Sequence, residues 1–357
     1  LFLIIVTLPL LLGGCGEKPN LKYENLNYEI KDGTVTITGC DIKASGALTI
    51  PATIEGNPVT SIGNQAFLAC TSLTSITIGN GVTSIGTAAF YRCGGVKSIT
   101  IPDSVTSIGH GAFYLCTSLT SLTIPDSVTS IGEGAFDQCT SLTNITIGNS
   151  VTSIGKDAFY KCSNLTNITI PDSVTSIGKQ AFYNCSSLTS ISIPDSVTNI
   201  GERAFFVCTS LTTIEVGAGN MNYTEVNGVL FNKEKTVLHT YPASKEGANY
   251  TIPDSVTSIE KHAFSNCINL TSITIPNSVT SIRNGTFNRC TRLTNITIHD
   301  SVTSIGNRAF GFCRSLTSIT IPDSITSIGD FAFQGCASIT SIEIPSGVTS
   351  IGGSAFL

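Results

Sequence analysis

The sequence lacks tryptophan, has a single methionine (Met221) and carries few charged side chains. Of its 357 residues only 12% are charged, against ~25% in ordinary globular proteins. The formal net charge is −5, and neither acidic nor basic residues gather in a block. A chain without a basic patch lacks the electrostatic footprint of a nucleic-acid binder and of a polybasic membrane segment. These absences exclude nucleic acid as an expected partner.

The apolar run at the N-terminus, residues 1–12, is too short to cross a bilayer as a helix. It has the length of the apolar region of a signal peptide, and the sequence Leu12-Gly13-Gly14-Cys15 that ends it resembles the lipobox of bacterial lipoproteins. The resemblance implies that residues 1–14 are a lipoprotein signal peptide, that Cys15 carries a lipid anchor and that residues 15–22 form a tether to the membrane. The alternative is an ordinary secretory signal in which Cys15 is incidental. The chain starts without methionine and ends inside a repeat unit, so we expect a fragment.

Phenylalanine and cysteine recur with a period of 23 residues. Eleven cysteines follow this step, with one gap of 59 residues between Cys208 and Cys267 that leaves 13 extra residues in one module. A phenylalanine stands three residues before each of these cysteines and once more at Phe356, which gives 12 modules. The 33 glycines and the excess of serine, threonine and isoleucine fit a β-rich repeat. A fixed period of this length indicates a solenoid of stacked coils.

Each module predicts a strand, a turn, a second short strand and a helical turn. Residues 121–124 alternate polar and apolar side chains, as a half-buried strand does. Pro125 ends this strand, and Val128 and Ile131 predict a second inward-facing stretch. Apolar residues spaced by one, three and three then predict one or two helical turns, namely Ala135, Phe136, Cys139 and Leu142. We therefore expect an α/β solenoid with a parallel β-sheet on one face and short helical turns and strands on the other.

The repeat LxxIxIPxxVxxIGxxAFxxCxxL resembles the BspA-like leucine-rich repeats of bacterial surface proteins and of some parasitic protists. It places a leucine-rich repeat solenoid over residues 51–357. Before it, two alternating runs flank the turn Lys31-Asp32-Gly33, which is a hairpin signal. Residues 23–50 resemble the N-terminal cap of this family, which covers the open end of a solenoid. In the long module two apolar runs flank a polar turn, so we expect a hairpin insertion at about residues 217–250, either a binding protrusion or a variant repeat.

The sequence shows no catalytic or metal-binding constellation. Cysteines 23 residues apart do not have the short spacing of a zinc site, and no histidine accompanies them. We expect buried free thiols, because stacked residues ~4.8 Å apart with parallel Cβ vectors do not suit a disulfide. The alternative is scattered disulfides in an oxidising exterior, for which Cys40 in the cap is the least constrained candidate. The recurring Pro-Asp pairs are explained by turns. We expect no enzyme activity, no cofactor and no metal.

Two exposed surfaces remain as candidates for binding. On the strand face, outward positions form a polar column that includes Thr100, Thr123, Thr146 and Thr169. The strand sheet of a leucine-rich repeat is its usual binding surface, although small uniform side chains predict weak contacts that act through avidity. The position after the phenylalanine forms an aromatic stripe with basic residues nearby, namely Tyr91, Tyr114, Tyr160 and Tyr183. Its rings could anchor protein or glycan, or pack on one another as a shield over the core.

The resemblance implies the expected function. Better-studied members of the family are associated with attachment to fibronectin and fibrinogen and with coaggregation. We therefore expect a non-enzymatic protein, anchored by lipid at the bacterial cell surface, that binds extracellular matrix proteins, surface proteins of other cells or glycans. The alternative is a structural or glycan-binding envelope protein. Ice binding is a third candidate, against which the breaks in the threonine array at Asn144, Asn167 and Glu215 argue.

Overall fold

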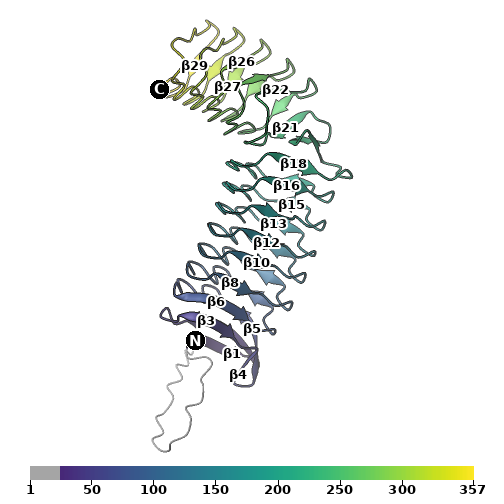
Figure 1. Ribbon diagram of the computed structural model, residues 1–357, viewed down its shortest axis with the longest axis vertical. Coiled ribbons are helices and arrows are strands. Elements are labelled where there is room, and N and C mark those ends of the chain that lie inside the picture. The colour runs from purple at the N-terminus through teal and green to yellow at the C-terminus, as the bar shows by residue number, and fades with distance from the viewer. Residues whose placement is uncertain (1–24) are drawn as a thin grey trace, which may run out of the picture.

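The computed structural model describes residues 25–357. The predicted signal peptide, Cys15 and the tether lie outside the described residues. Figure 1 shows an elongated solenoid whose coils stack along its length, with a change of direction between β18 (Thr213–Val216) and β21 (Val237–Thr240). None of the described residues forms a helix.

An antiparallel hairpin begins the described chain. β1 (Leu26–Lys31) pairs antiparallel with β2 (Thr34–Cys40). β2 then runs parallel to β5 (Asn57–Ile62), and β4 (Thr53–Ile54) pairs antiparallel with β5. The hairpin thus extends one sheet of the solenoid and covers an edge that would otherwise be unpaired.

The strand that follows each leucine forms a first parallel column. Its strands pair in register across coils, as Thr123 pairs with Thr146. Inward isoleucines alternate with outward serine, threonine and asparagine because successive side chains of a strand point to opposite faces. The strands of the first column before the junction are β3 (Gly46–Ile50), β6 (Leu73–Ile78), β8 (Ser98–Thr100), β10 (Ser121–Thr123), β12 (Asn144–Thr146), β14 (Asn167–Ile168), β16 (Ser190–Ile193) and β18.

A second parallel column consists of two-residue strands with the sequence Ser-Ile or Asn-Ile. After β5 its strands are β7 (Ser84–Ile85), β9 (Ser107–Ile108), β11 (Ser130–Ile131), β13 (Ser153–Ile154), β15 (Ser176–Ile177) and β17 (Asn199–Ile200). A glycine follows each strand where neighbouring coils are closest: a Cβ at Gly109 would lie 2.6 Å from the carbonyl carbon of Gly86. This close approach explains why the repeat ends its second strand with glycine.

The predicted helical turns, and with them the α/β class, are wrong. In the Ala-Phe-x-x-Cys segment the Phe113 N–H donates to the Ala135 carbonyl of the next coil at 2.8 Å, whereas the Tyr114 N–H donates to Gly111 of its own coil at 3.0 Å. The residues two before and two after the phenylalanine have positive φ, 57° at Gly111 and 60° at Leu115. Alternate N–H groups therefore point along the solenoid axis, and a helix would direct all of them back into its own turn. The solenoid consists of strands and turns.

Ladders of identical side chains fill the core. The phenylalanine rings from Phe67 to Phe205 stack coil on coil with centroids 4.9–5.8 Å apart, an offset arrangement that aromatic rings favour. Each of these rings is at most 5% exposed. A cysteine column runs beside the rings and is buried from Cys70 to Cys313. No coil could bury these groups alone, so stacking supplies the core.

An antiparallel meander joins two halves of the solenoid. β19 (Tyr223–Val226) pairs with β20 (Val229–Asn232), and β20 pairs with β21, which returns parallel to β23 (Ser258–Ile259). Two hydrophobic clusters meet here, one ending at Leu230 and one beginning at Val229. The second half continues the two columns with β22 (Asn249–Thr251), β24 (Ser272–Thr274), β25 (Ser281–Ile282), β26 (Asn295–Thr297), β27 (Ser304–Ile305), β28 (Ser327–Ile328) and β29 (Ser350–Ile351).

Candidate functional site

The structure places the four predicted threonines on the outer side of the first strand column. Thr100, Thr123 and Thr146 lie on β8, β10 and β12, and Thr169 directly follows β14; all four are exposed. Register pairing joins Thr123 to Thr146, so their side chains stand about 4.8 Å apart. The surface is a straight row of hydroxyl and methyl groups.

The hydroxyl groups of this row are not engaged within the described part of the chain. A neighbouring threonine column is different: the Thr120, Thr143 and Thr166 hydroxyls each donate to a carbonyl 23 residues earlier, at 3.1–3.2 Å. No such bond is formed by Thr100, Thr123, Thr146 or Thr169 within residues 25–357. The predicted row can therefore donate to and accept from a partner without breaking an internal bond.

The aromatic stripe is half-buried and stacks in pairs. The Tyr91 and Tyr114 rings have centroids 5.0 Å apart, and those of Tyr160 and Tyr183 are 4.5 Å apart, with interplanar angles of 16° and 14°. Cations of the same chain lie over two rings, Arg92 over Tyr91 and Lys161 over Tyr160. These contacts favour the packing alternative for the stripe, because they occupy ring faces that a partner would need.

Basic residues near the stripe are largely paired with acids. Lys156 lies 2.6 Å from Glu133, and Lys179 lies 3.7 Å from Glu202. These pairs are exposed, so they contribute little to stability, but they cancel the positive charge predicted for this side. The stripe is thus less basic than its residue types suggest.

Asp137 interrupts the stripe between Tyr114 and Tyr160. Burial raises the pKa of this carboxyl to about 6. Its Oδ1 atom is buried and has no hydrogen-bond partner among the described residues, while the neighbouring Gln138 amide donates to the Tyr114 hydroxyl at 3.1 Å. Asp137 therefore introduces a charge that the surrounding structure stabilises poorly at neutral pH.

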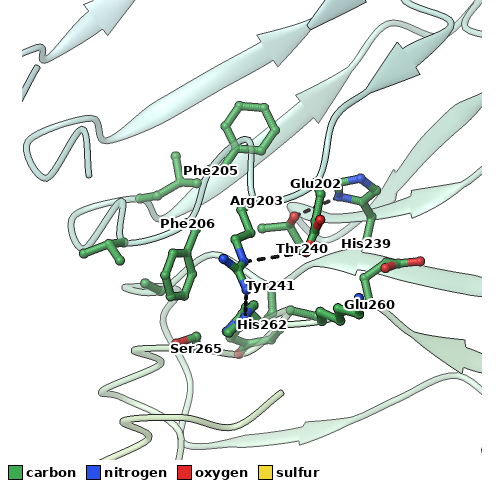
Figure 2. Close-up of a pocket in the computed structure, with 15 residues that line it drawn as sticks. Glu202, Arg203, Phe205, Phe206, His239, Thr240, Tyr241, Glu260, His262 and Ser265 are labelled. Carbon is green, nitrogen blue, oxygen red and sulfur yellow. Dashed lines mark hydrogen bonds and ion pairs between the residues drawn. The ribbon is translucent and has the colours of Figure 1, made fainter. Parts of the chain in front are cut away.

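A small cavity lies at the junction of the two halves (Figure 2). Arg203 reaches across it, and its Nη2 donates to His262 Nε2 at 2.8 Å. Because a guanidinium only donates, the neutral His262 carries its proton on Nδ1. Burial and the charge of Arg203 lower the pKa of His262 to about 4, and the Phe206 ring packs 4.7 Å from the imidazole. This cluster joins coils 59 residues apart in sequence.

The junction cavity is too small for most ligands. Its volume is about 40 Å³, room for roughly three water molecules. Tyr241 forms one wall and also stacks on Phe264 with centroids 5.0 Å apart. Tyr241 occupies the place of the phenylalanine missing from the periodic series, and Ser244 takes the place of the cysteine. This coil lies outside the phenylalanine and cysteine series, although Tyr241 stands 23 residues before Phe264.

Within the described residues no three His, Cys, Asp or Glu side chains gather as metal ligands would. Residues 25–357 contain no helix that is long and apolar enough to cross a membrane.

Comparison with known proteins identifies the repeat. A family model for the BspA type leucine rich repeat region matches in six copies, over residues 47–162, 106–238 and 239–357. A leucine rich cell surface protein from Faecalibacterium prausnitzii A2-165 is 38% identical, with a TM-score of 0.84, covering 93% of this chain and 94% of that chain. A leucine-rich repeat protein from Eubacterium ventriosum is 27% identical, with a TM-score of 0.57, covering 94% and 93%.

A more distant structure shares the fold. The pneumococcal vaccine antigen PcpA is 22% identical, with a TM-score of 0.68, and the match covers 94% of this chain and 85% of that chain. No curated protein matches the sequence.

Proposed function

Because this chain belongs to the family of BspA-type leucine-rich repeat proteins, we propose that it is a non-enzymatic scaffold at the bacterial surface that binds proteins of a host matrix or of other cells. The binding surface is the row of strand-face threonines, Thr100, Thr123, Thr146 and Thr169. The observation that carries this choice is their exposure together with hydroxyls that make no hydrogen bond to any other residue of the described part of the chain. Lipid attachment at Cys15 would hold the scaffold on the membrane.

The chemistry of the row favours many weak contacts. Each coil offers one hydroxyl and one methyl group, and a hydrogen bond to such a group contributes about 0.5–1.5 kcal/mol. Coils joined in one rigid solenoid bind an extended partner together, because the first contact raises the local concentration for the next. An extended polypeptide with regularly spaced polar groups is the partner that this row fits.

The test is binding of the purified protein to immobilised fibronectin, fibrinogen and a glycan array. Lysine at Thr100, Thr123, Thr146 and Thr169 is expected to abolish saturable protein binding. A matched control places four lysines on exposed threonines that each directly precede a strand of the second column, at Thr106, Thr129, Thr152 and Thr175, which adds the same charge. Serine at Tyr91, Tyr114, Tyr160 and Tyr183 tests the stripe.

The outcomes separate the alternatives. Loss in the first variant only supports the strand-face row, whereas loss in the tyrosine variant only assigns binding to the stripe. Binding to glycans alone, or to none of the probes, contradicts the proposal and favours an envelope role. Attachment through Cys15 is tested separately by labelling cells with a radioactive fatty acid, which must fail to label Cys15→Ser.

A further inference from the structure

Arginines gather on one side of the second half of the solenoid. Three successive turn segments, residues 283–293, 306–316 and 329–339, follow β25, β27 and β28 (Figure 1). They lie side by side, because the Phe287 N–H donates to the Ala309 carbonyl of the next coil at 2.8 Å. The three segments contain no lysine, one acid and five arginines, namely Arg283, Arg289, Arg292, Arg308 and Arg314. Five arginines and one acid give them a formal charge of +4, on a chain whose net charge is −5.

Four of these arginines are not neutralised by their own chain. Arg283 lies 3.1 Å from Glu260 of the preceding coil and donates to it. The other four are exposed and form no ion pair with any side chain of residues 25–357. The one acid of the three segments, Asp330, instead accepts a hydrogen bond from the Gly353 N–H at 2.7 Å. We call the four the arginine patch, namely Arg289, Arg292, Arg308 and Arg314.

The remaining acids of these coils lie on a different edge. Residues 271–339 contain two further acids, Asp300 and Asp323. Both stand in the turn that precedes a strand of the second column, β27 or β28, whereas the turn segments follow these strands. The aspartates and the arginine patch are therefore at opposite ends of this stretch of each coil. The positive potential over the patch is not cancelled locally.

Aromatic rings of the next coil orient two of the guanidinium groups. The guanidinium carbon of Arg289 lies 5.7 Å from the centre of the Phe312 ring, and that of Arg308 lies 5.0 Å from the centre of the Phe331 ring. A guanidinium held over a ring face keeps its N–H groups at the edge, where they can donate two parallel hydrogen bonds to one oxyanion. Because the fork is already oriented, less side-chain freedom is lost on binding.

The stacking of coils sets the spacing of the other two charges. Arg314 occupies the place of Thr291 one coil further on, and Thr291 is next to Arg292. Neighbouring coils are ~4.8 Å apart, so the Cα atoms of Arg292 and Arg314 lie about 6 Å apart. Like charges this close repel each other, and an anion between them relieves the repulsion. The four arginines are spaced by 3, 16 and 6 residues in the sequence, which is why the sequence shows no basic block.

We propose that the arginine patch binds a sulfated polysaccharide. Sulfate groups present oxygen pairs to the guanidinium forks, and polar neighbours of the patch, Asn288 and Gln334, can form hydrogen bonds with sugar hydroxyls. This site lies on other coils than the threonine row and takes a different class of ligand. It therefore goes beyond the proposed binding of proteins and does not depend on it.

The surroundings of the patch favour a glycan over other polyanions. Within residues 269–343 no large apolar side chain is exposed, so the patch lacks the apolar anchors on which protein interfaces depend. A single-stranded nucleic acid stacks its bases on open aromatic faces. Here the guanidinium groups of Arg289 and Arg308 cover the available rings.

Binding of purified protein to heparin, measured by titration calorimetry, tests the proposal. Neutralising a linear polyanion releases its condensed counterions, so four engaged arginines predict a slope of log affinity against log salt of about −3. The affinity should therefore fall about 50- to 150-fold between 50 and 200 mM salt. Heparin from which the sulfates have been removed should bind at least ~10-fold more weakly, because its remaining carboxylates carry fewer charges.

Two variants locate the site. The first removes the patch and should bind heparin about 100-fold more weakly at 50 mM salt, since each exposed charge contact contributes about 3-fold; it carries Arg289→Gln, Arg292→Gln, Arg308→Gln and Arg314→Gln. The matched control removes four exposed positive charges elsewhere and should bind within about 3-fold of the unchanged protein; it carries Lys31→Gln, Lys43→Gln, Lys97→Gln and Lys235→Gln. Far-UV circular dichroism establishes that both variants are folded.

Several results would overturn the proposal. They are absence of heparin binding at 50 mM salt, equal affinities of the patch variant and the unchanged protein, and an equal loss in the lysine control. Undiminished binding of desulfated heparin would overturn the assignment to sulfate. Single-stranded DNA or polyglutamate that binds the patch as tightly as heparin would overturn the choice of a glycan. Lysine substitutions in the threonine row test protein binding on other residues, so failure of that proposal is distinguishable from failure of this one.

Discussion

A glycine follows each strand of the second column before the junction, and Gly109 tests whether a side chain is tolerated where two such coils meet. A Cβ at Gly109 would lie 2.6 Å from the Gly86 carbonyl carbon and 2.7 Å from the Thr87 nitrogen. Both are backbone atoms of the preceding coil, which cannot rotate away. Gly109→Ala must therefore push two coils apart. Overpacking of a core costs about 1–3 kcal/mol, and contact with rigid backbone places this change at about 3 kcal/mol.

Gly94→Ala is the matched control. A Cβ at Gly94 would meet only the Thr117 hydroxyl, at 3.3 Å, and this side chain can rotate. Its φ lies outside the left-handed region, so alanine is expected to change stability by less than about 0.5 kcal/mol. Urea unfolding followed by circular dichroism measures both. With a slope of about 3 kcal/mol/M, Gly109→Ala should lower the midpoint by ~1 M, and equal midpoints for the two variants would refute the reasoning.

Three further predictions concern the turns, the aromatic ladder and Asp137. Ala88→Gly should stabilise the protein by about 1 kcal/mol because Ala88 has a φ of 53°. In a helical turn the same substitution would destabilise the protein by a similar amount, so the sign of the change in urea midpoint distinguishes the two conformations. Phe136→Ala should cost about 3–5 kcal/mol because the ring is 0% exposed and stacks on Phe113 and Phe159 at 5.2 and 5.4 Å; a loss below about 1 kcal/mol would contradict the stacked core. Asp137→Asn should stabilise the protein by about 1 kcal/mol at pH 7. This is less than the full free energy that corresponds to the raised pKa of Asp137, because solvent screens a half-buried side chain. Its folded pKa is raised, so the penalty disappears as the pH falls from about 6 toward ~4; urea midpoints that show the same gain at both ends of this range would rule out a buried charge as the cause.

The repeat made most of the fold predictable from sequence. The period, the parallel strands and the inward phenylalanine, isoleucine and cysteine ladders follow from side chains that recur every 23 residues. The conformation of the turn segment could not be predicted in this way, because apolar residues spaced by one, three and three suit both a helix and a series of turns. What separates them is the direction of alternate N–H groups, which depends on the next coil and not on the residues of one module.

The features of the candidate sites that the sequence did not predict lie where the 23-residue repeat is interrupted. The Arg203 and His262 pair joins coils across the inserted meander, and no spacing rule brings these two residues together. Tyr241 continues the ring stack with a different residue type, so the recurrence of phenylalanine and cysteine does not reveal its coil. Strand alternation predicts that the threonine row faces outward. That its hydroxyls make no hydrogen bond within residues 25–357 could not be predicted, because this depends on the backbone geometry that lets the neighbouring threonine column bond to the preceding coil.

Binding of protein partners along the threonine row can be tested by blocking one coil at a time. Lysine is introduced first at Thr146, then also at Thr123, Thr100 and Thr169, and the affinity for the protein partner is measured after each step. The affinity should fall roughly 2- to 10-fold per coil, because one hydrogen bond of about 0.5–1.5 kcal/mol is removed each time. An affinity unchanged by all four substitutions would contradict the row as the binding surface, and complete loss at the first step would contradict an extended contact.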